Sequence, residues 1–111
     1  MTPIILIAED DADIRGLLRL YLEGEGFRVL EADDGSKALE LARTHSPDMA
    51  ILDIMMPGLN GFELTRALRQ YSQLPILILS AKNQDNDKIL GLNLGADDYI
   101  AKPFNPVEIV A

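Results

Sequence analysis

Short apolar runs alternate with segments of helical periodicity along the whole chain. Most of these runs are four or more residues long and, apart from 27–32, which includes Arg28 and Glu31, they are apolar at successive positions, so both sides of the strands should be buried. This pattern is typical of a parallel sheet that helices cover on both faces. The predicted strands span residues 4–8, 27–32, 49–52, 75–79 and 99–101.

The segments between these runs predict helices. After the first run, apolar residues recur at the spacing of one helix face: Ile14, Leu17, Leu18, Tyr21 and Leu22. We expect Asp11 to cap this helix, and Gly24 and Gly26 to end it.

Four further helices are predicted along the chain. A turn at Asp34 and Gly35 precedes a helix that begins at Ser36, and two more helices cover residues 61–70 and 85–94. A fifth begins at Asn105, because the residues that follow have proline in the first turn and glutamate at the capping-box position.

This alternation predicts a flavodoxin-like α/β fold, a doubly wound parallel sheet of five strands in the order 2-1-3-4-5. The 111 residues suit one domain. In such folds, ligands bind beyond the carboxyl ends of the strands, at the point where the strand order reverses. We therefore expect a functional site at that edge of the sheet.

The amino-acid composition excludes several classes of function. Hydrophobic residues make up 48% of the chain, which is enough for a packed core. Cysteine is absent, which excludes disulfides and thiolate chemistry, and no apolar run is long enough to span a bilayer. The start of the chain lacks a basic leader, so we expect a cytoplasmic protein. The formal net charge of −8 argues against direct binding to nucleic acid.

Chemically active residues stand where the predicted strands end. The first strand is followed by Glu9 and Asp10, the third by Asp53, the fourth by Ser80 and the fifth by Lys102. Carboxyl ends of parallel strands share one edge of the sheet, so these side chains should form a single site. Asp53 is the most unusual of them, because a carboxylate beside a buried run loses solvation unless something pairs with it.

The carboxylates of this cluster favour a cation. Two carboxylates about 4 Å apart repel each other by roughly 4 kcal/mol at an effective dielectric constant near 20. Lys102 neutralises only one of the charges. Because the ligands are hard oxygens, without histidine or cysteine, the predicted ion is Mg²⁺ or Mn²⁺ rather than zinc.

This combination of groups suits the transfer of a phosphoryl group to Asp53: a metal ion, the Lys102 ammonium, the Ser80 hydroxyl and the carboxylates. The cations neutralise the phosphoryl oxygens, Ser80 donates to one of them, and the carboxylate attacks in line. No GxxxxGK[ST] loop occurs, so the chain does not hold a nucleotide in that way. The phosphoryl group should come from another donor.

Four stretches carry a family resemblance: "AEDD", "LDIMMPGLNG", "ILSA" and "GADDYIAKPF". In this order and over the whole chain, they resemble the CheY-like receiver domain of two-component response regulators. The resemblance implies a signalling domain rather than an enzyme, beyond catalysis of its own phosphorylation and dephosphorylation. It implies phosphorylation by a sensor histidine kinase, without contact to a membrane.

The resemblance assigns the metal ligands and the acceptor. Asp53 matches the aspartate that accepts the phosphoryl group, and it is also one of the metal ligands. Asp10 matches a direct Mg²⁺ ligand, and Glu9 one that acts mainly through water. The remaining ligand is the backbone carbonyl two residues past the acceptor, here Met55.

The resemblance also assigns the groups that answer phosphorylation. Ser80 matches the switch hydroxyl and Tyr99 the aromatic switch. Lys102 matches the lysine that pairs with the acceptor, and the bond to Pro103 would be cis.

We expect the domain that produces the response to phosphorylation to lie outside residues 1–111. The chain is most like receivers joined to winged-helix DNA-binding domains, which pair after phosphorylation through a face made by the fourth helix, fifth strand and fifth helix. Lys88, Asp97, Asp98 and Glu108 match charged positions on that face. The chain ends at Ala111, inside the predicted fifth helix, so we expect residues 1–111 to be a truncated receiver that lacks its output domain.

Three alternatives remain: an aspartyl-phosphate phosphatase, a receiver-like module that is never phosphorylated, and a stand-alone receiver that acts by protein contact. The phosphatase usually has a second acid where this chain has Met55. The complete set of site residues argues against the second alternative. His45, the only histidine, is predicted to be an exposed residue rather than a phosphoryl donor, and Met55 and Met56 have no soft-metal partners.

Overall fold

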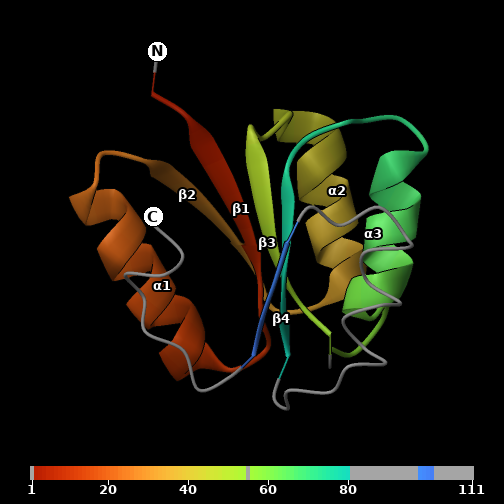
Figure 1. Ribbon diagram of the computed structural model, residues 1–111, viewed down its shortest axis with the longest axis horizontal. Coiled ribbons are helices and arrows are strands. Elements are labelled where there is room, and N and C mark those ends of the chain that lie inside the picture. The colour runs from red at the N-terminus through yellow and green to blue at the C-terminus, as the bar shows by residue number, and fades with distance from the viewer. Residues whose placement is uncertain (1, 55, 81–97, 102–111) are drawn as a thin grey trace.

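Within the described residues, five parallel strands form one sheet in the order β2-β1-β3-β4-β5. The computed structural model describes residues 2–54, 56–80 and 98–101 (Figure 1). The predicted class and strand order are confirmed. The strands are β1 (Ile4–Ala8), β2 (Arg28–Ala32), β3 (Met49–Asp53), β4 (Ile76–Ser80) and β5 (Asp98–Ala101).

Helices α1 (Ala12–Gly24), α2 (Gly35–His45) and α3 (Gly61–Arg69) connect the first four strands. Helix α1 lies on one face of the sheet, and α2 and α3 lie on the other (Figure 1). Helices on both faces were predicted, and this is confirmed. The helices predicted over 85–94 and from Asn105 lie outside the described residues.

Alternating side chains of the strands divide the core into two layers. Ile5 and Ile7 of β1 pack with Leu18 and Leu22 of α1. Leu6 of β1 points to the opposite face, where α2 and α3 supply the apolar cover. Each fully buried leucine or isoleucine contributes roughly 1.5–3 kcal/mol, so side chains on both faces of β1 stabilise its position in the sheet.

The apolar face predicted for α1 is narrower than expected. Leu18 and Leu22 are buried and Ile14 is half-buried, but Leu17 and Tyr21 are 42% and 40% exposed. The spacing predicts only that the five residues share one face of the helix, and that face is buried over part of its width. Each lies one position before a buried leucine and is therefore rotated about 100° around the helix axis from that leucine.

The helix starts follow from their caps. Asp11 accepts hydrogen bonds from the backbone N–H groups of Asp13 and Ile14, as predicted for the cap of α1. Asp34, predicted as part of a turn, instead caps α2 by accepting from the N–H of Lys37 at 2.7 Å. Helix α2 therefore begins at Gly35, one residue earlier than predicted.

Candidate functional site

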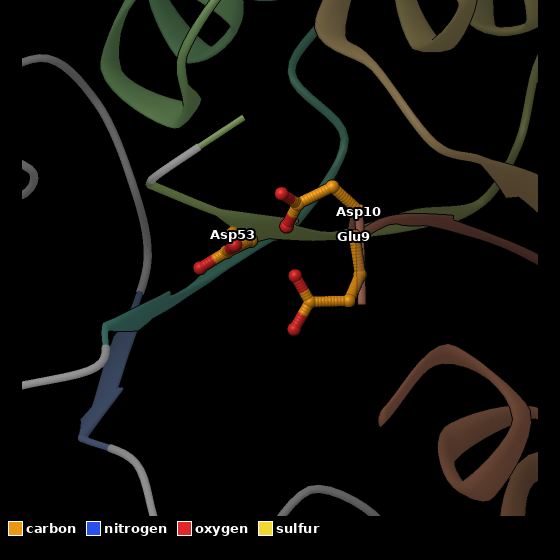
Figure 2. Close-up of side chains that lie close together, drawn as sticks. All are labelled: Glu9, Asp10 and Asp53. Carbon is orange, nitrogen blue, oxygen red and sulfur yellow. The ribbon is translucent and has the colours of Figure 1, made fainter. Parts of the chain in front are cut away.

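Three carboxylates meet at the carboxyl edge of the sheet. One oxygen each of Glu9, Asp10 and Asp53 lies within 4.8 Å of the other two (Figure 2). Glu9 and Asp53 are buried, with 0% and 3% of their surface exposed, whereas Asp10 is exposed. The arrangement leaves two buried acids and one solvent-facing acid around a common point.

The register of the sheet explains this meeting. In the parallel pairing of β1 and β3, Ala8 lies opposite Leu52, so the next residues along the two strands are Glu9 and Asp53. Strand β1 also pairs with β2, on its other side. The chain therefore reverses its winding at β1 and β3, and the acids lie at the switch point where ligands bind in such sheets.

The turn after β3 holds the backbone of Asp53 closely. The N–H of Gly61, the first residue of α3, donates to the carbonyl of Ile54 at 3.0 Å. A Cβ atom at position 61 would lie 2.4 Å from the carbonyl oxygen of Asp53. Gly58, within the turn, has a φ of +74°, which favours glycine. The "PGLNG" stretch thus brings α3 directly against the strand end that bears Asp53.

The donor set fits a hard divalent cation. Three carboxylates this close repel one another, and burial strengthens the repulsion because it removes solvent screening. A cation at their common point relieves it. Because the candidate ligand atoms among the described residues are carboxylate oxygens, Mg²⁺ or Mn²⁺ suits them better than a softer metal.

Two other predicted site residues lie on neighbouring strands. Ser80 is the last residue of β4 and follows Leu79, the partner of Asp53 in the sheet. Tyr99 lies in β5 opposite Ile78, and Ala101 lies opposite Ser80. The backbone therefore brings the ends of β3, β4 and β5 to one edge, as predicted.

The remaining predictions divide between described and undescribed residues. Lys102, Met55, Lys88, Asp97 and Glu108 lie outside the described residues. Asp98 is the first residue of β5. His45 is exposed at the end of α2, as predicted, and Met56 is buried in the core layer beneath α2 and α3.

Sequence reasoning missed one residue at the site. Arg15 of α1 donates a hydrogen bond from its guanidinium to the carbonyl oxygen of Glu9 at 2.8 Å. The only signal for it in the sequence is its place on the first turns of the helix that follows the acidic pair. That signal is weak, because the reach of an arginine depends on how the helix is rotated.

Comparison with known proteins decides the family. The sequence matches the response regulator receiver domain over residues 5–111. The chain belongs to this family. Among solved structures, this receiver superimposes on the Francisella response regulator 1452 receiver domain with a TM-score of 0.93 and 39% identity, over 98% of this chain and 91% of that one. It superimposes on the BeF3-activated N-terminal receiver domain of Klebsiella pneumoniae RstA with a TM-score of 0.91 and 36% identity, over 96% and 92% of the chains.

Curated relatives are longer proteins. The response regulator GtcR of Aneurinibacillus migulanus is 57% identical over 111 residues, which are 100% of this chain and 46% of that protein. The alkaline phosphatase synthesis transcriptional regulatory protein PhoP of Bacillus subtilis is 47% identical over 112 residues, covering 100% of this chain and 47% of PhoP. This receiver thus spans about half the length of the curated relatives it matches.

The family membership establishes the general role. The chain is a receiver domain of a two-component response regulator, a class of signalling domains that work with histidine kinases. Among the helices that the structure describes, none has the length and apolar character needed to cross a membrane.

Proposed function

We propose that Asp53 is the residue of this receiver that accepts a phosphoryl group. The observation that carries the proposal is the placement of this buried carboxylate at the switch point, with oxygens of Glu9 and Asp10 within 4.8 Å. A buried acid with an open, solvent-facing neighbour suits a nucleophile that must be reached by a phosphoryl donor.

The metal would be held by Glu9, Asp10 and Asp53, together with the backbone carbonyl of Met55. The carboxylate oxygens of the first three fit Mg²⁺, and Mn²⁺ would substitute for it. When bound, the ion would neutralise the carboxylates and the oxygens of the transferring phosphoryl group. The sheet contributes by holding the acids in place before the ion arrives.

The proposed step is a transfer from a phosphohistidine of a sensor kinase. A carboxylate oxygen of Asp53 forms a bond to phosphorus while the phosphorus–nitrogen bond of the donor breaks, and the imidazole nitrogen keeps the electron pair. Lys102 neutralises negative charge on the phosphoryl group, and Ser80 donates a hydrogen bond to one of its oxygens. The product is an acyl phosphate on Asp53.

The new charge on Asp53 would act through Ser80 and Tyr99, on β4 and β5. The face that responds comprises the predicted helix at 85–94, β5 and the predicted helix from Asn105. Its charged positions Lys88, Asp97, Asp98 and Glu108 would pair two phosphorylated copies. The name of the relative PhoP supports a role in transcription. We propose that the receiver acts in the cytoplasm and controls transcription through a separate DNA-binding domain.

Intact-mass spectrometry after incubation with acetyl phosphate tests this proposal. With MgCl₂ present, the protein should gain one phosphoryl group, and a chelator or the change Asp53→Asn should prevent it. Repeated turnover of a small phosphate ester would indicate the phosphatase alternative instead. Binding of Mg²⁺ without any adduct would indicate a module that is not phosphorylated.

A further inference from the structure

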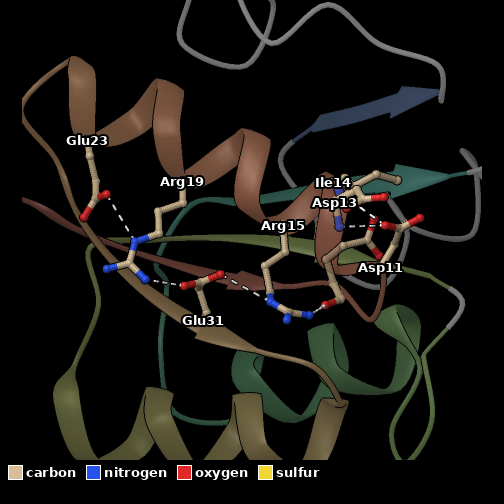
Figure 3. Close-up of polar contacts among 8 residues, drawn as sticks. Asp11, Asp13, Ile14, Arg15, Arg19, Glu23 and Glu31 are labelled. Atoms are coloured by element: carbon tan, nitrogen blue, oxygen red, sulfur yellow. Dashed lines mark hydrogen bonds and ion pairs between the residues drawn. The ribbon is translucent and has the colours of Figure 1, made fainter.

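Arg15 links the acidic pair to strand β2. Its side chain is 21% exposed, and its Nη1 donates to the carbonyl oxygen of Glu9 at 2.8 Å. Its Nε donates to Oε1 of Glu31 at 3.2 Å (Figure 3). One guanidinium therefore joins the end of β1 to a carboxylate on the neighbouring strand.

Further ion pairs hold Glu31 in place. Its second oxygen accepts from Nη1 of Arg19, and Nε of Arg19 donates to Glu23 at 3.1 Å (Figure 3). Hydrogen bonds to Glu23 and Glu31 raise the pKa of Arg19. Because both oxygens of Glu31 are engaged, the carboxylate has a fixed orientation, and so has the plane of the Arg15 guanidinium.

The atom that Arg15 holds belongs to the site. The carbonyl oxygen of Glu9 is part of the peptide group between Glu9 and Asp10, which is planar and carries both Cα atoms. This peptide lies just beyond β1, which ends at Ala8. In the preceding peptide group, between Ala8 and Glu9, the N–H of Glu9 donates to the carbonyl of Ala32 at 3.0 Å. A fixed oxygen therefore sets the direction from which both carboxylates leave the backbone.

We propose that Arg15 is a positioning residue for the metal site. Through the carbonyl of Glu9 it orients the two acids, and through Glu31 it is itself oriented. The inference rests on the proposed function, because it assumes that Glu9 and Asp10 hold Mg²⁺. Partners that orient metal ligands typically change metal affinity about 10–100-fold when they are removed.

The charge of Arg15 and its contact with Glu9 should have opposite effects on Mg²⁺ affinity. A guanidinium near a cation site repels the cation, so loss of its charge alone would strengthen Mg²⁺ binding. Loss of positioning would weaken it. The sign of the change therefore separates the two effects.

Calorimetric titration with MgCl₂ of the parent and four variants tests the proposal. Arg15→Met should weaken binding about tenfold, and Arg15→Lys, which keeps the charge and one donor, should recover part of the loss. Arg28→Met removes the same charge at the exposed start of β2, at the opposite end of the strand from Ala32, and its affinity should stay within about twofold of the parent. Asp10→Asn marks the loss expected when a ligand itself is removed. Thermal melting without metal shows that each variant is folded.

The outcomes are distinguishable. Equal or tighter binding by Arg15→Met overturns the positioning role while leaving the proposed metal site intact. Equal losses in Arg15→Met and Arg28→Met overturn it too, because the loss of affinity would then not depend on the contact with Glu9. Should Arg15→Met fail to fold, Glu31→Gln is titrated as a further variant, and unchanged affinity in both it and Arg15→Lys overturns the proposal. Absence of binding by the parent overturns the metal site and this inference together.

Discussion

At the scale of single residues, Gly61 shows how tightly the surroundings of Asp53 are built. Its backbone approaches Asp53 so closely that a Cβ atom would lie 2.4 Å from the carbonyl oxygen and 2.9 Å from the carbonyl carbon. Both neighbours are backbone atoms of a central strand, which cannot move aside cheaply. A methyl group at this position would displace either α3 or the strand end.

We therefore expect Gly61→Ala to lower the free energy of unfolding by about 1–3 kcal/mol, and to reduce the yield of the phosphoryl adduct. Gly16, in the middle of α1, is a matched control because a Cβ atom there meets nothing within 4 Å. Gly16→Ala should stabilise the protein by roughly 0.5–1 kcal/mol. Urea unfolding of both variants measures the difference, and equal effects would contradict the close approach.

Some residues of the site could be predicted from the sequence and others could not. Asp53 and the acidic pair follow from one rule, that parallel strands end at the same edge. The contact between Arg15 and Glu9 does not follow from any such rule, because it depends on the rotation of α1 and on a side chain with many rotamers. The contact of Gly61 with Asp53 depends on the path of a turn, which the glycines indicate but do not define.

At the scale of elements, the start of α3 is fixed by a reciprocal cap. The side chain of Asn60 accepts from the N–H of Glu63 at 2.8 Å, and the side chain of Glu63 accepts from the N–H of Asn60 at 3.0 Å. This capping box follows directly after the turn that carries the chain away from Asp53. It satisfies two backbone donors at the start of the helix.

Asn60→Ala should lower the free energy of unfolding by about 1 kcal/mol. Asn60→Asp keeps an acceptor for the N–H of Glu63 and should cost clearly less. Chemical denaturation of the two variants measures both values. A loss in Asn60→Asp as large as that in Asn60→Ala would show that the cap does not stabilise α3.

The boundaries of the strands were predicted more accurately than the exposure of individual residues on the helices. The observed strands begin and end within one residue of their apolar runs, because continuous apolar stretches mark strands buried on both faces. The exposure of Leu17 and Tyr21 on α1 was not foreseen. Helical spacing identifies a face but not its width, which depends on how closely the sheet follows the helix.

At the scale of the whole molecule, the sheet gathers residues that are far apart in the sequence. Glu9 and Asp53 follow partners in adjacent strands, and Ser80 ends the next strand along. A net charge of −8 adds to the repulsion within this cluster, so metal binding and folding should be linked. The topology was predictable because alternation of strands and helices permits few right-handed arrangements.

The most direct test of the account is to locate the phosphoryl group. After treatment with acetyl phosphate and MgCl₂, borohydride reduction converts an aspartyl phosphate into homoserine, which marks the residue permanently in a peptide map. The account predicts the mark at Asp53, with Glu9 and Asp10 unmodified. A mark at Asp10 or at another acid, with Asp53 unchanged, would contradict it.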